Sequence, residues 1–111
     1  MPAYKFVVFT NPAEGKEAEY NRWYDEIHLG EVTSLPGFTG ARRLRNLPQG
    51  DAAPKHKYMA IYEIESDDIA ATMKGLFEHA SAGRFNMSDA MGADVETLLY
   101  EETTVRDAAR A

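Results

Sequence analysis

The chain has 111 residues, 44% of them hydrophobic, which is enough for one core and predicts a single domain spanning residues 1–111. A formal net charge of −6 argues against nucleic acid or an anionic membrane as a partner. The absence of cysteine excludes disulfides, thiolate nucleophiles and cysteine-ligated metals, and it fits a reducing cytoplasm. No leader segment and no apolar run long enough to span a bilayer stands out, so we expect a soluble cytoplasmic protein.

The first half of the chain alternates strand, helix and strand. Residues 4–10 are aromatic and β-branched on both faces and predict a strand that needs cover on both sides. Apolar residues at helical spacing predict an amphipathic helix over residues 16–28, which Gly30 weakens and Pro36 ends. A second strand is predicted at 38–45.

Alternation along that second strand assigns its side chains to two faces. Phe38, Arg42 and Leu44 are predicted to share one face, and Arg43 to lie on the other. If the Phe38 side faces the helices, Arg42 is the arginine that reaches a pocket.

The second half repeats the order of elements after a loop at 46–55. A strand is predicted at 56–64, and Ser66 is predicted to cap a helix over 67–80. The irregular stretch 84–94 carries Phe85 and two methionines, which suit the lining or the cover of a pocket. A fourth strand is predicted at 95–103.

This order predicts an α+β fold: a ferredoxin-like βαββαβ sandwich whose four-stranded antiparallel sheet carries its helices on one face. Strands that are apolar on both sides leave the other face in need of a partner, and a second copy of the chain is the simplest one. We therefore expect a homodimer. The alternative is a monomer whose open face holds only scattered apolar side chains.

His28 is the candidate for chemistry, because an imidazole can transfer protons near neutral pH. Tyr24 lies one helical turn before it, and Glu31 follows three residues later. The competing interpretation is a histidine that only packs or caps the end of its helix.

The segment NRWYDEIHLGEVTSLPGF, residues 21–38, resembles the dimeric α+β barrel superfamily, and within it the EthD-like branch with its W-Y-x-x-x-H-x-x-E-V pattern. The resemblance implies a pocket between sheet and helices in each protomer and a dimer formed by sheets packing face to face. Members include cofactor-free monooxygenases, isomerases, polyketide cyclases and haem enzymes, so the fold does not choose a reaction. Where relatives often have proline, this chain has Gly30.

The leading hypothesis is a cofactor-independent isomerase of an unsaturated carboxylic acid from aromatic-compound catabolism. His28 would act as general acid and base, with Glu31 or Asp25 orienting its ring. Tyr24, Tyr58 or Tyr62 would donate a hydrogen bond to an enolate oxygen, although core packing is an alternative role for each.

Binding of this small organic acid would depend on an arginine and on aromatic walls. Arg42 or Arg43 would hold the carboxylate, unless both are solvated strand charges. Trp23 and Phe85 would wall the pocket, with plain core as the alternative for Trp23. No metal and no cofactor is expected, since the histidines have no metal-site spacing. Alternative functions are a cofactor-free monooxygenase, a polyketide cyclase, or a non-catalytic ligand-binding or stress-associated dimer.

Overall fold

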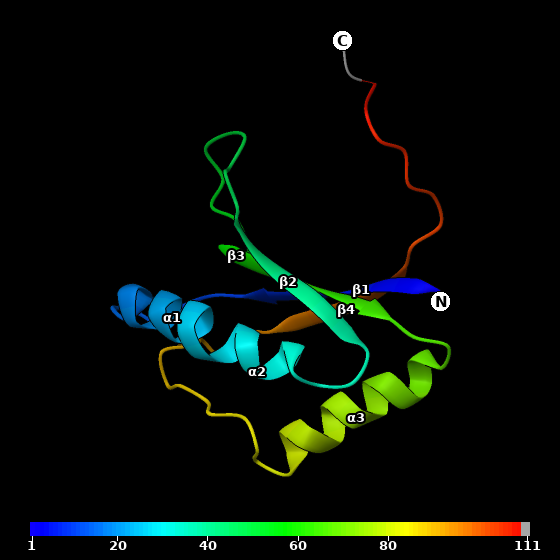
Figure 1. Ribbon diagram of the computed structural model, residues 1–111. Coiled ribbons are helices and arrows are strands. Elements are labelled where there is room, and N and C mark those ends of the chain that lie inside the picture. Colours follow the sequence, from blue (N-terminus) through cyan, green and yellow to red (C-terminus); the bar gives the residue numbers. More distant parts are fainter. Residues whose placement is uncertain (110–111) are drawn as a thin grey trace.

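The computed structural model describes residues 1–109 and has the predicted ferredoxin-like α+β fold, with one antiparallel sheet and its helices on one side (Figure 1). The strands run β2, β3, β1, β4 across the sheet. One continuous helix runs through α1, the π-helical turn η1 and α2, and a second helix, α3, precedes the last strand. In chain order the elements are β1 Ala3–Thr10, α1 Glu17–Trp23, η1 Tyr24–His28, α2 Leu29–Thr33, β2 Phe38–Arg45, β3 Tyr58–Glu65, α3 Ile69–Ser81 and β4 Glu96–Glu101.

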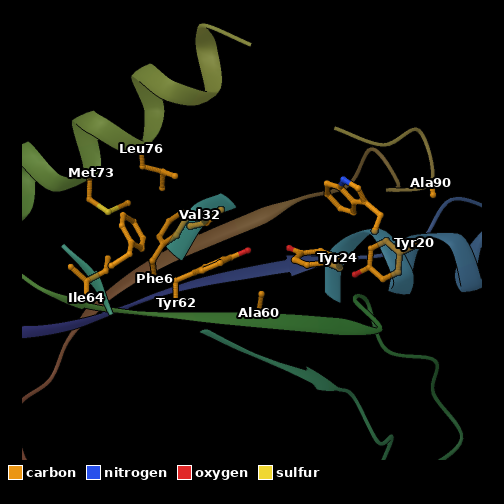
Figure 2. Close-up of a cluster of buried hydrophobic side chains, with 12 residues drawn as sticks. Phe6, Tyr20, Tyr24, Val32, Ala60, Tyr62, Ile64, Met73, Leu76 and Ala90 are labelled. Carbon is orange, nitrogen blue, oxygen red and sulfur yellow. The ribbon is translucent and has the colours of Figure 1, made fainter. Parts of the chain in front are cut away.

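The core lies between the sheet and the helices (Figure 2). Phe6, Tyr62 and Ile64 project from β1 and β3, and they meet Val32 of α2 and Leu76 of α3. Each such side chain contributes about 1.5–3 kcal/mol when fully buried, so this contact holds the helices against the sheet. The same contact fixes the position of every side chain between the two layers.

The predicted face assignment in β2 is wrong because the strand contains a β-bulge. Phe38 pairs with Ile64, yet Gly40 pairs with Glu63, the very next residue back along β3. Thr39 is therefore extra, and a bulge of this kind inverts the alternation of all residues after it. As a result Phe38 is buried under the helices, whereas Arg42 lies on the opposite face of the sheet.

The first helix is longer than predicted. It continues through Gly30 and ends at Thr33, since one glycine costs a packed helix only about 1 kcal/mol. Gly37 reverses the chain with a φ of +88°, and a Cβ there would lie 3.0 Å from the Thr72 side chain. Both the backbone conformation and the close approach of α3 thus require glycine at this position.

The predicted cap of α3 is also corrected. The N-cap is Asp68, whose carboxylate accepts a hydrogen bond from the Ala71 N–H at 3.1 Å. Ser66 accepts from the Asp68 N–H at 3.0 Å and so supports the capping residue rather than the helix itself. The helix consequently starts at Ile69, two residues later than predicted.

The other face of the sheet carries no helix (Figure 1). Val7, Ile61 and Leu98 lie side by side on it, since Val7 pairs with both of the others across the ladder. Leu98 is 45% exposed and Tyr100 is 55% exposed. Within residues 1–109, none of the helices is long and apolar enough to cross a lipid bilayer.

Candidate active site

A cavity of about 230 Å³ lies between the sheet and the helices. Its walls are mainly apolar, and Phe6, Val8, Leu76, Phe77, Phe85, Met87 and Met91 are among the residues that line it. Four side chains with nitrogen or oxygen atoms also line it, namely Tyr24, His28, Tyr62 and Thr97. Ligand sites typically measure about 300–1,000 Å³, so this cavity lies just below that range and has room only for a small guest.

The π-helical turn η1 determines where His28 lies. The Leu29 N–H bonds to the Tyr24 carbonyl, five residues back, which widens the helix locally. Residues five apart on a regular α-helix point roughly 140° away from each other. Here Trp23 and His28 stack instead, with ring centroids 4.6 Å apart and planes 21° apart. The wide turn therefore brings the imidazole over the indole, and such turns often occur at functional sites.

The environment of His28 favours a neutral imidazole. Its ring makes edge-to-face contacts with the rings of Tyr24 and Phe85, whose centroids lie 5.3 and 5.4 Å from that of the imidazole. Its Nδ1 is buried and has no hydrogen-bond partner. Burial lowers the pKa of His28 below its ordinary value, and the charge of Glu31 acts weakly against that shift. A neutral imidazole can accept a proton at neutral pH, as a general base must.

Glu31 binds the segment after α3 and not the imidazole. Its carboxylate accepts hydrogen bonds from the Asn86 N–H at 3.1 Å and from the Asn86 side-chain amide at 2.8 Å. Trp23 donates from Nε1 to the Asn86 carbonyl at 2.6 Å. These bonds hold the segment that places Phe85 against His28, and Figure 1 shows it running back beneath α1.

Two of the three predicted tyrosines line the cavity. Figure 2 shows the hydroxyl ends of Tyr24 and Tyr62 turned toward one another. The Tyr62 hydroxyl is buried and makes no hydrogen bond of ordinary geometry. Burial raises the pKa of both phenols, and interaction with the Tyr24 hydroxyl adds to the rise at Tyr62. Both remain protonated donors at neutral pH. Tyr58 lies outside the cavity and donates to Glu17 at 2.6 Å.

The two predicted arginines lie apart, and neither lines the cavity. Arg42 is exposed on the helix-free face, where it pairs with Glu63 at 3.3 Å. Arg43 faces the helices and donates a hydrogen bond to Asp25 at 2.8 Å. Asp25 therefore binds this arginine and does not orient the ring of His28 as predicted. The Arg43 guanidinium lies over the rings of Tyr20, Tyr24 and Tyr58, at 5.1, 4.6 and 4.9 Å from the centroids.

Tyr20 belongs to this arrangement and was missed from the sequence as a site residue. It is fully buried and its hydroxyl shares a short hydrogen bond with Thr10. Its spacing of four residues from Tyr24 was the available signal, since such residues lie on one helix face. Among residues 1–109, no three His, Asp or Glu side chains gather closely enough to suggest a metal site.

Comparison with solved structures gives the same fold, whereas no family model and no curated protein matches the sequence. An EthD family protein from Bacillus halodurans is 18% identical, with a TM-score of 0.60, covering 93% of this chain and 100% of that one. The haem-degrader MhuD from Mycobacterium tuberculosis is 23% identical, with a TM-score of 0.60 and coverage of 96% and 99%. SnoaB, a cofactor-independent oxygenase from Streptomyces nogalater, is 20% identical, with a TM-score of 0.55 and coverage of 96% and 95%. These likenesses confirm the predicted ferredoxin-like α+β fold.

Proposed function

We propose that the protein is a small-molecule enzyme in which His28 takes a proton from a neutral, mainly apolar substrate held in the cavity. The observation that carries the proposal is that two buried polar groups, the His28 Nδ1 and the Tyr62 hydroxyl, have no hydrogen-bond partner. Both belong to residues that line the same apolar cavity. Buried polar groups normally have partners, and an orphan typically costs about 1–3 kcal/mol. A ligand with a hydroxyl or carbonyl oxygen would supply the missing partner once these side chains turn their polar atoms into the cavity.

The substrate class follows from the walls of the cavity. No arginine or lysine among residues 1–109 lines it, so an ionised carboxylate would be buried there without a cation. A phenol or an enolisable ketone enters neutral and becomes an anion only after His28 has taken its proton. Tyr24 and Tyr62 would then donate hydrogen bonds to the anionic oxygen, which lowers the energy of that anion. This favours a neutral substrate over the unsaturated carboxylic acid expected from the sequence.

Two reactions can follow from the same anion. In an isomerase, the proton returns from the imidazole to a different carbon, and no atom is gained or lost. In an oxygenase, dioxygen adds at a carbanion carbon that still carries a hydrogen, and the peroxide anion takes up the proton to give a hydroperoxide. Loss of water from the hydroperoxide then leaves a carbonyl. The likeness to SnoaB, described as a cofactor-independent oxygenase, supports testing the second reaction beside the first.

Haem, which MhuD holds in its solved structure, does not fit this cavity. A volume of about 230 Å³ is small even for an ordinary ligand site. The described lining also offers no cationic side chain for the two propionates of a haem. The proposed chemistry therefore uses only the side chains of the protein.

The test is proton exchange and oxygen uptake with a panel of phenols and enolisable ketones. We expect the wild-type protein to accelerate deuterium exchange, read by NMR, and His28→Gln to slow it by about 10²- to 10⁴-fold. His79→Gln is the matched control, because His79 packs against Phe85 yet does not line the cavity. Exchange with oxygen uptake identifies an oxygenase, and exchange without it an isomerase. Ligand-induced stabilisation without either would contradict catalysis and leave the binding-module alternative.

We also propose that the helix-free face of the sheet forms a homodimer. Leu98 and Tyr100 are half exposed there, next to Lys5 and Val7 of β1, and neighbouring exposed apolar side chains of this kind suit a protein interface. Sedimentation equilibrium should give twice the mass of one chain. Leu98→Glu should shift the protein to monomer, and a wild-type monomer at micromolar concentration would contradict the proposal.

A further inference from the structure

Arg43 holds a buried positive charge directly behind the wall of the cavity. Its side chain is 11% exposed, and its guanidinium carbon lies 4.6 Å from the ring centroid of Tyr24. Tyr24 lines the cavity and Arg43 does not. The cation thus acts on the cavity through an aromatic ring, without touching anything bound there.

This charge is only partly neutralised. Asp25 accepts a hydrogen bond from Nη1 at 2.8 Å, but its carboxylate side chain is 59% exposed and is therefore screened by water. Asn21 accepts from Nη2 at 2.9 Å and brings no charge. The Nε atom is buried without a hydrogen-bond partner. A guanidinium in such surroundings is costly unless the faces of aromatic rings help to stabilise it.

We propose that Arg43 is a positioning residue that stabilises the anion formed in the cavity by strengthening the Tyr24 hydroxyl as a hydrogen-bond donor. The inference rests on the proposed function. As the hydroxyl shares its proton with a bound anion, negative charge develops on the phenol. A cation against the face of that ring favours this charge by Coulomb attraction, more strongly in a dry interior than in water.

The electrostatics around Tyr24 agree with this role. Burial raises the pKa of Tyr24, and the charge of Arg43 opposes the rise. The titratable groups that contact the guanidinium are Tyr20, Tyr24 and Asp25 from the helix and Tyr58 from β3, and its charge also opposes the rise in the pKa of Tyr62. The Asp25 carboxylate bonds to the guanidinium and so reduces the charge that Tyr24 experiences.

A purely structural role is the competing explanation, since Arg43 also joins β2 to the first helix through Asp25 and Asn21. The two explanations differ in one measurable quantity. A structural clamp affects stability alike whether the cavity holds a neutral or an anionic guest. An electrostatic role changes the preference of the cavity for the anion.

The experiment titrates bound para-nitrophenol, whose neutral and anionic forms differ in visible absorbance. We expect Arg43→Met to reduce the preference of the folded protein for the phenolate over the phenol by roughly tenfold. Arg45→Met is the matched control, because Arg45 lies two residues further along the same face of β2 and is exposed to solvent. That control should change the preference by less than about twofold.

A second variant gives a change of opposite sign in a protein that keeps Arg43. Asp25→Asn removes the counter-charge and keeps an oxygen acceptor, so it should raise the phenolate preference by about threefold. In a Tyr24→Phe background, Arg43→Met should lose most of its effect, because the hydroxyl through which it acts is absent.

Each outcome decides something. An unchanged or lower preference in Asp25→Asn, or an unchanged one in folded Arg43→Met, overturns the inference and leaves proton exchange by His28 intact. An effect of Arg43→Met that persists in full without the Tyr24 hydroxyl also overturns it. Failure of the wild-type cavity to bind para-nitrophenol would overturn this inference, whereas the proposed function is decided separately by proton exchange with the panel of phenols and ketones.

Discussion

The ring of Tyr24 separates two regions that use the same residue types in different ways. On the Arg43 side, the tyrosine hydroxyls are bonded: Tyr20 to Thr10 and Tyr58 to Glu17. On the cavity side, the Tyr62 hydroxyl and the His28 Nδ1 have no partner. The difference shows that residue type alone does not mark the site. What distinguishes the cavity is that its unpaired buried groups belong to side chains that line a hollow, whereas the unpaired Nε of Arg43 lies behind the wall of that hollow.

The largest expected effect comes from removing the wall itself. Tyr24→Ala would join the two regions and should reduce the free energy of unfolding by about 3–5 kcal/mol, the usual cost of deleting a buried aromatic ring. Tyr24→Phe keeps the wall and should cost at most about 1 kcal/mol. Urea unfolding measures both. Equal losses in the two variants would mean that the hydroxyl, and not the ring, holds the regions apart.

The second effect contrasts a bonded hydroxyl with an unpaired one. Tyr20→Phe breaks the bond to Thr10 and should reduce the free energy of unfolding by about 1 kcal/mol. Tyr62→Phe removes a buried hydroxyl that has no partner, so stability should stay constant or rise by up to about 1 kcal/mol. The comparison is made by urea unfolding at one pH. A clear loss in Tyr62→Phe would show that its hydroxyl is bonded in solution.

The smallest effect is the dependence of stability on pH that comes from His28. Burial lowers the pKa of His28 in the folded state. As pH falls below about 6.5, His28 therefore binds a proton in the unfolded chain but not yet in the folded protein. Wild-type stability should therefore fall, relative to His28→Gln, from about pH 6.5 down to the lowered pKa and then stay level. Thermal melts of both proteins across this range measure the difference. Parallel curves would mean that the imidazole is solvated.

Most of the fold could be predicted from the sequence because its strands and helices have clear periodicity. The assignment of Arg42 and Arg43 failed at one point, the bulge at Thr39. A period of two predicts faces only while no residue is extra, and Gly40 next to the bulge was the one local hint. A one-residue shift was enough to exchange the inward and outward arginines.

Only some members of the candidate site were predictable, since Trp23, Tyr58 and both arginines do not line the cavity, and the contacts were not predictable. His28, Tyr24 and Tyr62 line the cavity, as their positions on helix and strand suggested. The partner of Glu31 could not be predicted, because Asn86 lies 55 residues away in an irregular segment. Such pairings depend on how the whole chain packs, and no local pattern reports them.

The wide turn from Tyr24 to His28 has a consequence for comparing this protein with others. Deleting one residue there would restore ordinary helix geometry and leave tryptophan and histidine four residues apart, still on one face of the helix. A spacing of five within a wide turn and a spacing of four on a regular helix therefore place the two rings alike. A chain with one position fewer between them would present its histidine to the same neighbour.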